Sequence, residues 1–293
     1  MSVILNFPEY RVQAQHLAEA LSIPCESIEV HHFPDKESRI TIPGIFPDHA
    51  IIYCGLEYPN DKLVELMLTV KTLNQHNCNR VSLVTPYLCY MRQDMAFHKG
   101  EAISQDIIGR YLAELFDDII TIDAHLHRTT SLQQVFPDTN TVHISAASSF
   151  TQLLQQNTAD VVLLGPDEES EQWVKTIATE NNLAYAVARK VRHSDKDVSI
   201  MLPEFDFENK PVVLVDDVIS SGGTMVNIAK QLQQKNIRQL DVLVTHALFN
   251  KNTQDKLKQA GINHIWSSDS IPHPSNKVSI IPLVAEHVKN WIS

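Results

Sequence analysis

Short apolar runs of strand length alternate along the chain with segments whose apolar residues recur at helical spacing. The runs are rich in Val, Ile and Leu, as is typical of strands buried on both faces of a parallel sheet. They cover residues 81–84, 119–122, 161–164, 212–215 and 242–244. Amphipathic helices are predicted within residues 63–70, 107–115 and 225–232, the second with Ser104 as its N-cap. This alternation predicts an α/β fold.

The alternation runs through the chain twice. In each half a buried strand ends beside a proline, at Pro86 and at Pro166, and a later strand ends in aspartate, at Asp123 and at Asp216. We therefore expect two similar tandem domains, residues 1–145 and 146–293, each a mainly parallel sheet flanked by helices.

Composition narrows the class of protein. Hydrophobic residues make up 43% and charged residues 20% of the 293 positions, the balance of a soluble globular protein. The net charge of −11 argues against a protein that binds nucleic acid through bulk electrostatics. The apolar runs are shorter than the roughly 20 residues of a membrane span. The four cysteines lack CxxC spacing, so we expect a cytoplasmic protein without a disulfide framework.

The strongest chemical motif follows the apolar run 212–215. Two acids, Asp216 and Asp217, precede a loop of small and hydroxylated residues that leads into a predicted helix: Ser220, Ser221, Gly222, Gly223 and Thr224. Only eight residues of the chain are glycine, so two adjacent ones indicate a backbone that needs to lack Cβ atoms. Amides of such a loop can hold a phosphate, and the acids suit sugar hydroxyls or a metal-bound water. Together they describe a site for ribose 5-phosphate; the alternative is an ordinary strand–turn–helix connection.

Two further segments suit a nucleotide. Arg92 can stack on a purine or bind a phosphate, and Gln93 and Asp94 can read the polar edge of a base. The alternative is a surface turn with an Arg–Asp pair. Phe33 offers a ring to stack on adenine, and Asp35 and Glu37 offer acceptors for its amino group; the alternative is a hairpin with a packed phenylalanine.

Two cations and a histidine complete the candidate chemistry. Lys190 and Arg192 alternate on a predicted strand, so both would face one side, and the polar segment 193–197 follows them. They could close over a phosphoryl centre, or simply form a basic surface strand. His125 follows a strand end; with Asp167 it is a candidate for metal–phosphate chemistry, although a lone histidine is usually a satisfied polar residue.

Seven segments resemble, in order, motifs of the ribose-phosphate diphosphokinase (PRPP synthetase) family, and residues 216–224 resemble the PRPP loop of the type I phosphoribosyltransferase fold. The segments are Phe33–Glu37, Pro86–Asp94, His98–Ser104, Asp123–His125, Gly165–Asp167, Lys190–Arg192 and Asp269–Pro272. The resemblance implies transfer of the β,γ-diphosphoryl group of Mg-ATP to O1 of ribose 5-phosphate, giving AMP and PRPP.

The resemblance also implies roles for the residues. Lys190 and Arg192 would be catalytic, and Mg²⁺ would bind at His125 and Asp167. ATP would bind through Phe33, Asp35, Glu37, Arg92, Gln93, Asp94 and His125. Ribose 5-phosphate would bind through Asp167, Asp216, Asp217 and residues 220–224. Phe33, Asp35 and Glu37 would reach adenine from a neighbouring subunit, which implies a homo-oligomer.

The chain departs from the family pattern at several positions. Lys36 stands where the family has Gly, Met95 where many members have Arg or Lys, and Ser220 where synthetases usually have Asp. The segment 168–171 adds three acids, Glu168, Glu169 and Glu171, which would repel a bound phosphate unless they point away from it. Two alternatives follow. A PRPP-consuming phosphoribosyltransferase would explain residues 216–224 but leave the other motifs unused. A catalytically silent synthetase-like subunit would bind nucleotide and regulate a partner.

Overall fold

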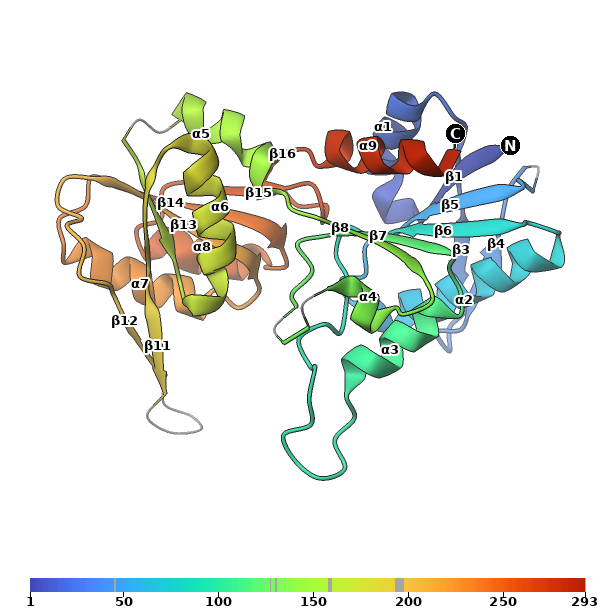
Figure 1. Cartoon of the computed structure of the whole chain (residues 1–293), viewed down its shortest axis with the longest axis horizontal. Coiled ribbons are helices and arrows are strands. Elements are labelled where there is room, and N and C mark those ends of the chain that lie inside the picture. The colour runs from blue at the N-terminus through green and yellow to red at the C-terminus, as the bar shows by residue number, and fades with distance from the viewer. Residues whose placement is uncertain (45, 127, 130, 158–159, 193–197, 293) are drawn as a thin grey trace. The chain divides into compact units, whose positions relative to one another are not determined.

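A computed structural model describes residues 1–293 except 45, 127, 130, 158–159, 193–197 and 293 (Figure 1). The chain divides into two compact units: unit 1 contains Met1–Ser145 and Ile280–Ser293, and unit 2 contains Ala146–Ser279. The C-terminal segment therefore belongs to unit 1, whereas the sequence had placed it in the second domain.

Unit 1 is built on a six-stranded sheet in which all neighbouring strands are parallel, in the order β2-β1-β5-β6-β7-β8. The strands are β1 (Ser2–Asn6), β2 (Cys25–Ser27), β5 (His49–Tyr53), β6 (Arg80–Val84), β7 (Asp118–Ile122) and β8 (Asn140–Ile144). Alternate apolar residues of β1, β5, β6 and β7 pack with one face of α2 (Pro59–Gln75) in a single buried cluster. An antiparallel hairpin of β3 (Glu29–His32) and β4 (Ser38–Thr41) lies outside this sheet.

The helical segments of unit 1 are η1 (Pro8–Tyr10), α1 (Arg11–Leu21), α2 (Pro59–Gln75), α3 (Ser104–Ala113), α4 (Leu132–Val135) and α9 (Ile281–Ile292). Helix α9 packs against α1 and buries Val284 and Val288 completely. Arg80 Nη1 also donates to the carbonyl of Trp291 at 3.3 Å. Apolar burial thus explains why the last helix joins the first unit.

The predicted cap of α3 is wrong. The N-cap residue is Ile103, and Ser104 is the first helical residue. The Ser104 hydroxyl instead donates to Gln93 Oε1 at 2.7 Å, a contact between segments 11 residues apart.

Unit 2 repeats the arrangement. Its parallel sheet has the order β10-β9-β13-β14-β15-β16, and each position corresponds to one in unit 1. A hairpin, β11–β12, follows β10 as β3–β4 follows β2. The strands are β9 (Val162–Gly165), β10 (Ala184–Val187), β11 (Arg189–Arg192), β12 (Val198–Met201), β13 (Pro211–Ile219), β14 (Gln239–Ala247), β15 (Ile265–Ser268) and β16 (Asn276–Val278). The expected α/β fold with two similar parallel-sheet domains is confirmed.

The helical segments of unit 2 are η2 (Ala147–Phe150), α5 (Thr151–Asn157), η3 (Glu168–Ser170), α6 (Glu171–Asn181), α7 (Gly223–Gln233) and α8 (Lys251–Gln259). Apolar residues of α7, among them Ile228 and Leu232, pack on the buried side chains of β13 and β14. Within the described residues of the whole chain, we find no helix that is long and apolar enough to cross a membrane.

Candidate active site

Strand β13 carries the two acids of the principal motif. The sequence placed them at the strand tip, but backbone pairing with β14 continues to Ile219. Because successive residues of a strand face opposite sides of the sheet, Asp216 is partly exposed while Asp217 is only 3% exposed. Asp216 Oδ1 accepts a hydrogen bond from the Asp217 amide at 3.0 Å. Asp216 is therefore the acid of the pair that solvent reaches more readily.

The loop after β13 leads into α7, and no side chain caps the first turn of this helix. Ser220, Ser221 and Gly223 are exposed and Thr224 is half-buried. Amides at an uncapped helix N-terminus attract anions, since they carry partial positive charge and lack intrahelical partners. An uncapped helix N-terminus thus stands where the sequence predicts a phosphate.

The two adjacent glycines meet different surroundings. Gly222 has φ +72°, and a Cβ added there would lie 2.9 Å from Thr253 Cγ2. A Cβ at Gly223 would meet only Ser221 Oγ, at 3.9 Å. Gly222 is thus required by the conformation and packing of unit 2, whereas Gly223 leaves the amide edge open.

Asp167 and Lys190 are brought together from two other elements of unit 2. Asp167 follows β9 and caps η3, where its Oδ1 accepts from the Ser170 amide at 3.1 Å. Lys190, on β11, donates through Nζ to Asp167 Oδ2, and its side chain is 39% exposed. The side chain of Arg192 and the whole segment 193–197 lie outside the described residues.

The acids of this region make it electronegative. Desolvation of its carboxylate, although the residue is partly exposed, and then the negative charges of Asp217 and Asp167 raise the pKa of Asp216 well above its usual value. A divalent cation would relieve this repulsion, and carboxylates are the ligands that Mg²⁺ prefers. Among the described residues, no group of three or more His, Cys, Asp or Glu side chains is arranged to hold a metal. Carboxylate oxygens of the kind that suit Mg²⁺ are thus present in this region.

The extra acids after Asp167 face solvent. Glu168, Glu169 and Glu171 are exposed, and Glu168 Oε1 lies 3.9 Å from Arg189 Nε. Ser170, between them, is fully buried because it completes the cap of η3. Because these acids face solvent, they should repel a bound phosphate less strongly than the sequence suggested.

In unit 1, the segment 92–94 lies between β6 and α3. Arg92 is exposed, whereas Gln93 accepts from Ser104. Asp94 Oδ1 accepts from Arg128 Nη1 at 2.7 Å, and its Oδ2 accepts from the Arg128 amide at 3.2 Å. Sequence reasoning missed Arg128, which is 34 residues from Asp94, because no local pattern marks the pair. Gln93 and Asp94 therefore bond to protein groups, and Arg92 is the exposed member of the motif.

His125 is half-buried in the loop that follows β7. The turn before it is fixed by the Ala124 amide, which donates to His143 Nε2 at 2.9 Å. Burial lowers the pKa of His143, which favours the neutral ring that can accept this bond. His125 is thus presented from an anchored turn of unit 1.

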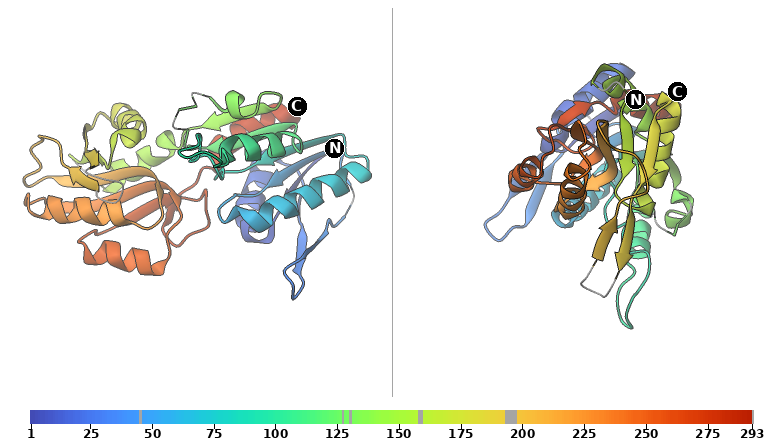
Figure 2. Two further views of the ribbon diagram at one scale, coloured as in Figure 1. Left: turned by 90° about the horizontal axis from the view of Figure 1, so that it is seen from below. Right: turned by 90° about the vertical axis from the view of Figure 1, so that its left-hand side faces the viewer.

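The remaining predicted nucleotide residues are on the tip of the β3–β4 hairpin, where Phe33, Asp35 and Glu37 are exposed. The tip is closed by a bond from the Phe33 amide to the Glu37 carbonyl at 2.8 Å. Lys36 adopts φ +72°, so the turn keeps the left-handed conformation in which glycine is favoured. The hairpin projects from unit 1 well away from the loop between β6 and α3 (Figures 1 and 2). The two nucleotide motifs of unit 1 are therefore not brought together.

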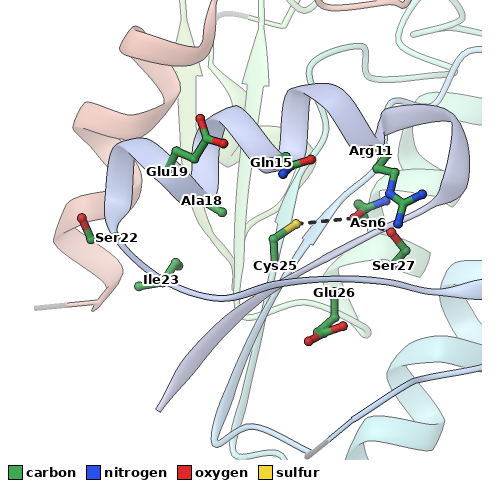
Figure 3. Close-up of a pocket in the computed structure, with 10 residues that line it drawn as sticks. All are labelled: Asn6, Arg11, Gln15, Ala18, Glu19, Ser22, Ile23, Cys25, Glu26 and Ser27. Carbon is green, nitrogen blue, oxygen red and sulfur yellow. Dashed lines mark hydrogen bonds between the residues drawn. The ribbon is translucent and has the colours of Figure 1, made fainter.

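A separate pocket of about 410 Å³ opens between α1 and the edge strand β2 (Figure 3). Arg11, Glu19 and Glu26 give its lining both signs of charge, and Cys25 Sγ donates to Asn6 Oδ1 at 3.5 Å. None of the predicted site residues lines this pocket.

Comparisons with known proteins agree with this architecture. Residues 2–115 match the N-terminal domain of ribose phosphate pyrophosphokinase, and residues 138–283 match the phosphoribosyl transferase domain. The chain is 32% identical to the ribose-phosphate pyrophosphokinase of Methanopyrus kandleri over 98% of this chain and 99% of that protein. It is 30% identical to the ribose-phosphate pyrophosphokinase of Sulfurisphaera tokodaii over 94% of this chain and 96% of that protein.

A solved structure gives the same fold. The crystal structure of phosphoribosylpyrophosphate synthetase from Mycobacterium smegmatis superimposes with a TM-score of 0.85 at 19% identity, covering 100% of this chain and 99% of that chain. Both domain models and full-length relatives thus agree, and the chain belongs to the ribose-phosphate pyrophosphokinase family.

Proposed function

We propose that this chain is a ribose-phosphate pyrophosphokinase that transfers the diphosphoryl group of ATP to O1 of ribose 5-phosphate. O1 forms a bond to the β-phosphorus as its proton leaves, and the bond from that phosphorus to the α–β bridging oxygen breaks. The bridging oxygen departs with AMP, and the sugar becomes PRPP. One observation carries the proposal: unit 2 of this family member contains Asp216, the open amide loop 220–224 and the Lys190–Asp167 pair together.

Ribose 5-phosphate would bind along β13 and its loop. The amides and hydroxyls of residues 220–224 would hold the 5-phosphate, and Asp216 and Asp217 would serve the 2- and 3-hydroxyls. The openness above Gly223 supports the first role, because a phosphate oxygen needs close approach to backbone amides. Asp216 is partly exposed and Asp217 is buried, so the second role is better supported for Asp216 than for Asp217.

Lys190 and Arg192 would stabilise the charge that develops on the transferring group. In the structure Lys190 pairs with Asp167, so its ammonium must leave this carboxylate before it can act on a phosphoryl oxygen. Asp167 and His125 are the proposed magnesium ligands, and Mg²⁺ supplies neutralisation of phosphate charge when it is bound. Positioning and electrostatics would supply the rate, without a covalent enzyme intermediate.

ATP would bind through Arg92, the 93–94 segment, His125 and the hairpin residues Phe33, Asp35 and Glu37. The separation of hairpin and loop within unit 1 supports a site that combines the hairpin of one subunit with the loop of another, and hence a homo-oligomer.

Complementation tests this arrangement. Phe33→Ala and Arg92→Ala should each be nearly inactive alone, and dissociating and reassembling them together should restore part of the activity. If the mixed oligomers stay as inactive as the separate variants, the shared site is wrong.

Purified protein with Mg-ATP and ribose 5-phosphate, assayed for AMP and PRPP together, tests the reaction. Equal amounts of both products are expected. Tight ATP binding with no product would favour the silent regulatory subunit, to which the departures at Met95 and at residues 168–171 point. Consumption of PRPP only when a nucleobase is added would favour the phosphoribosyltransferase alternative.

A further inference from the structure

The base of the β3–β4 hairpin tip is tied to a buried carboxylate on α2. Glu65, only 5% exposed, accepts at Oε1 from Ser38 Oγ at 2.7 Å. His32 Nδ1 lies 3.1 Å from Ser38 Oγ and 3.7 Å from the same oxygen of Glu65. A serine hydroxyl has one proton, which here goes to Glu65, so His32 Nδ1 must be the donor to Ser38. The result is a chain of contacts from His32 through Ser38 to Glu65.

This chain of contacts lies directly beside the predicted nucleotide residues. His32 and Ser38 face each other in the β3–β4 register and form the last pair before the tip. Because side chains alternate along a strand, fixing His32 toward α2 turns Phe33 to the opposite face. There Phe33 is 41% exposed, and its ring meets the His31 ring edge-on, with centroids 4.8 Å apart. A slip of one residue would reverse this and direct Phe33 toward α2.

The hairpin needs such an attachment. A two-stranded ribbon by itself is at best marginally stable in water. Val30 and Ile40 of the hairpin pack against the core cluster of unit 1 as partly buried residues, and they lie farther from the tip than His32 and Ser38 do. A buried carboxylate is a poor source of stability compared with a well-packed apolar residue. Glu65 is therefore better explained by the orientation that it gives to the hairpin than by stability.

We propose that Glu65, acting through Ser38 and His32, is a positioning residue for the nucleotide: it holds the 33–37 tip so that Phe33, Asp35 and Glu37 face outward to receive the adenine ring. The inference rests on the proposed function. Glu65, Ser38 and His32 act through the tip and do not themselves touch the substrate.

Ser38→Ala tests the proposal, with Thr41→Ala as its matched control. Thr41 is an exposed hydroxyl residue on the same strand, at the other end of the hairpin. We expect Ser38→Ala to raise KM for ATP about tenfold, which corresponds to loss of roughly 1.4 kcal/mol, the size of one hydrogen bond to a charged group. The kcat and the KM for ribose 5-phosphate should stay within about twofold of those of the Thr41→Ala control.

Glu65 itself gives a graded series. Glu65→Gln keeps an oxygen that can accept from Ser38, so KM for ATP should rise only about threefold, whereas Glu65→Ala should match or exceed the effect of Ser38→Ala. A Ser38→Ala protein that behaves like Thr41→Ala would overturn the proposal. A lower kcat and a higher KM for both substrates, together with a lower melting temperature, would also overturn it, since that is the signature of a merely structural contact.

Amide hydrogen exchange gives a readout that does not depend on turnover. The amides of Phe33 and Lys36 are bonded within the tip, to the carbonyls of Glu37 and Phe33. Both should exchange faster in Ser38→Ala than in Thr41→Ala, and equal exchange would overturn the anchoring whatever the activity. Failure of the unmodified chain to form AMP and PRPP would instead overturn the proposed function, and the nucleotide role of the tip with it.

Discussion

Replacing each glycine of the 220–224 loop separately distinguishes the demands of folding from those of binding. Gly222→Ala places a residue with a Cβ in the left-handed region, which costs about 1–2 kcal/mol. The new Cβ would also lie 2.9 Å from Thr253 Cγ2, closer than van der Waals contact allows. Relieving such crowding typically costs a further 1–3 kcal/mol or so. We therefore expect Gly222→Ala to destabilise unit 2 by about 2–5 kcal/mol.

Gly223→Ala should behave in the opposite way. The nearest atom to its Cβ is Ser221 Oγ at 3.9 Å, and the residue is the first of α7, where alanine is favoured over glycine. Its stability should match or slightly exceed that of the parent. The methyl group would, however, occupy the open edge of the amide loop and raise KM for ribose 5-phosphate by about tenfold or more, equivalent to loss of roughly one charged hydrogen bond.

Thermal unfolding and steady-state kinetics check the pair. The loss in Gly222→Ala corresponds to a drop in melting temperature of roughly 6–15 °C for a domain of this size. If Gly223→Ala binds ribose 5-phosphate as well as the parent does, the loop does not hold the phosphate. If Gly222→Ala is as stable as the parent, the assignment of that glycine to the fold is wrong.

Four other changes have defined outcomes. Lys190→Ala should lower kcat by roughly 10²–10⁴, whereas Arg189→Ala, on the same strand, should leave it nearly unchanged; near-normal turnover without Lys190 would refute its role. Because the pKa of Asp216 is raised in the folded protein, its ionisation destabilises the fold as pH rises through that pKa. Asp216→Asn should therefore be more stable than the parent by on the order of 1 kcal/mol in urea unfolding at pH 8, with the difference vanishing toward pH 4; an equal difference at both pH values would contradict this. Val288→Ala should destabilise unit 1 by about 2 kcal/mol through lost burial of this fully buried side chain of α9, and unchanged melting would show that α9 does not support unit 1. Lys36→Gly should stabilise the hairpin turn by roughly 0.5–1 kcal/mol, since it removes a side chain from a left-handed position; a melting temperature that stays the same or falls would argue against strain there.

Local patterns were sufficient for much of the fold. The apolar runs predicted β6, β7, β9, β13 and β14, and helical spacing predicted α2, α3 and α7. The strand–loop–helix motif around Gly222 was also predictable, because its parts are contiguous and its geometry depends on neighbouring residues. Boundaries were less predictable: β13 runs on to Ile219 because β14 continues to supply hydrogen-bond partners.

Contacts between distant segments needed the tertiary structure. Arg128 engages Asp94, Glu65 engages Ser38, and Ser104 bonds to Gln93 instead of capping its helix. In each case a side chain can satisfy its charge or hydrogen bond in several ways, and the partner chosen depends on which loops the fold brings together.

The sequence by itself therefore determined the α/β class, the doubled architecture and the residue types of the candidate site, since periodicity and contiguous motifs encode them. Only the tertiary structure decided that α9 belongs to unit 1, that Lys190 forms an ion pair with Asp167, and that Gly222 is packed closely while Gly223 is open. The physical reason is that burial and electrostatic pairing depend on distances through space, which a linear pattern does not contain.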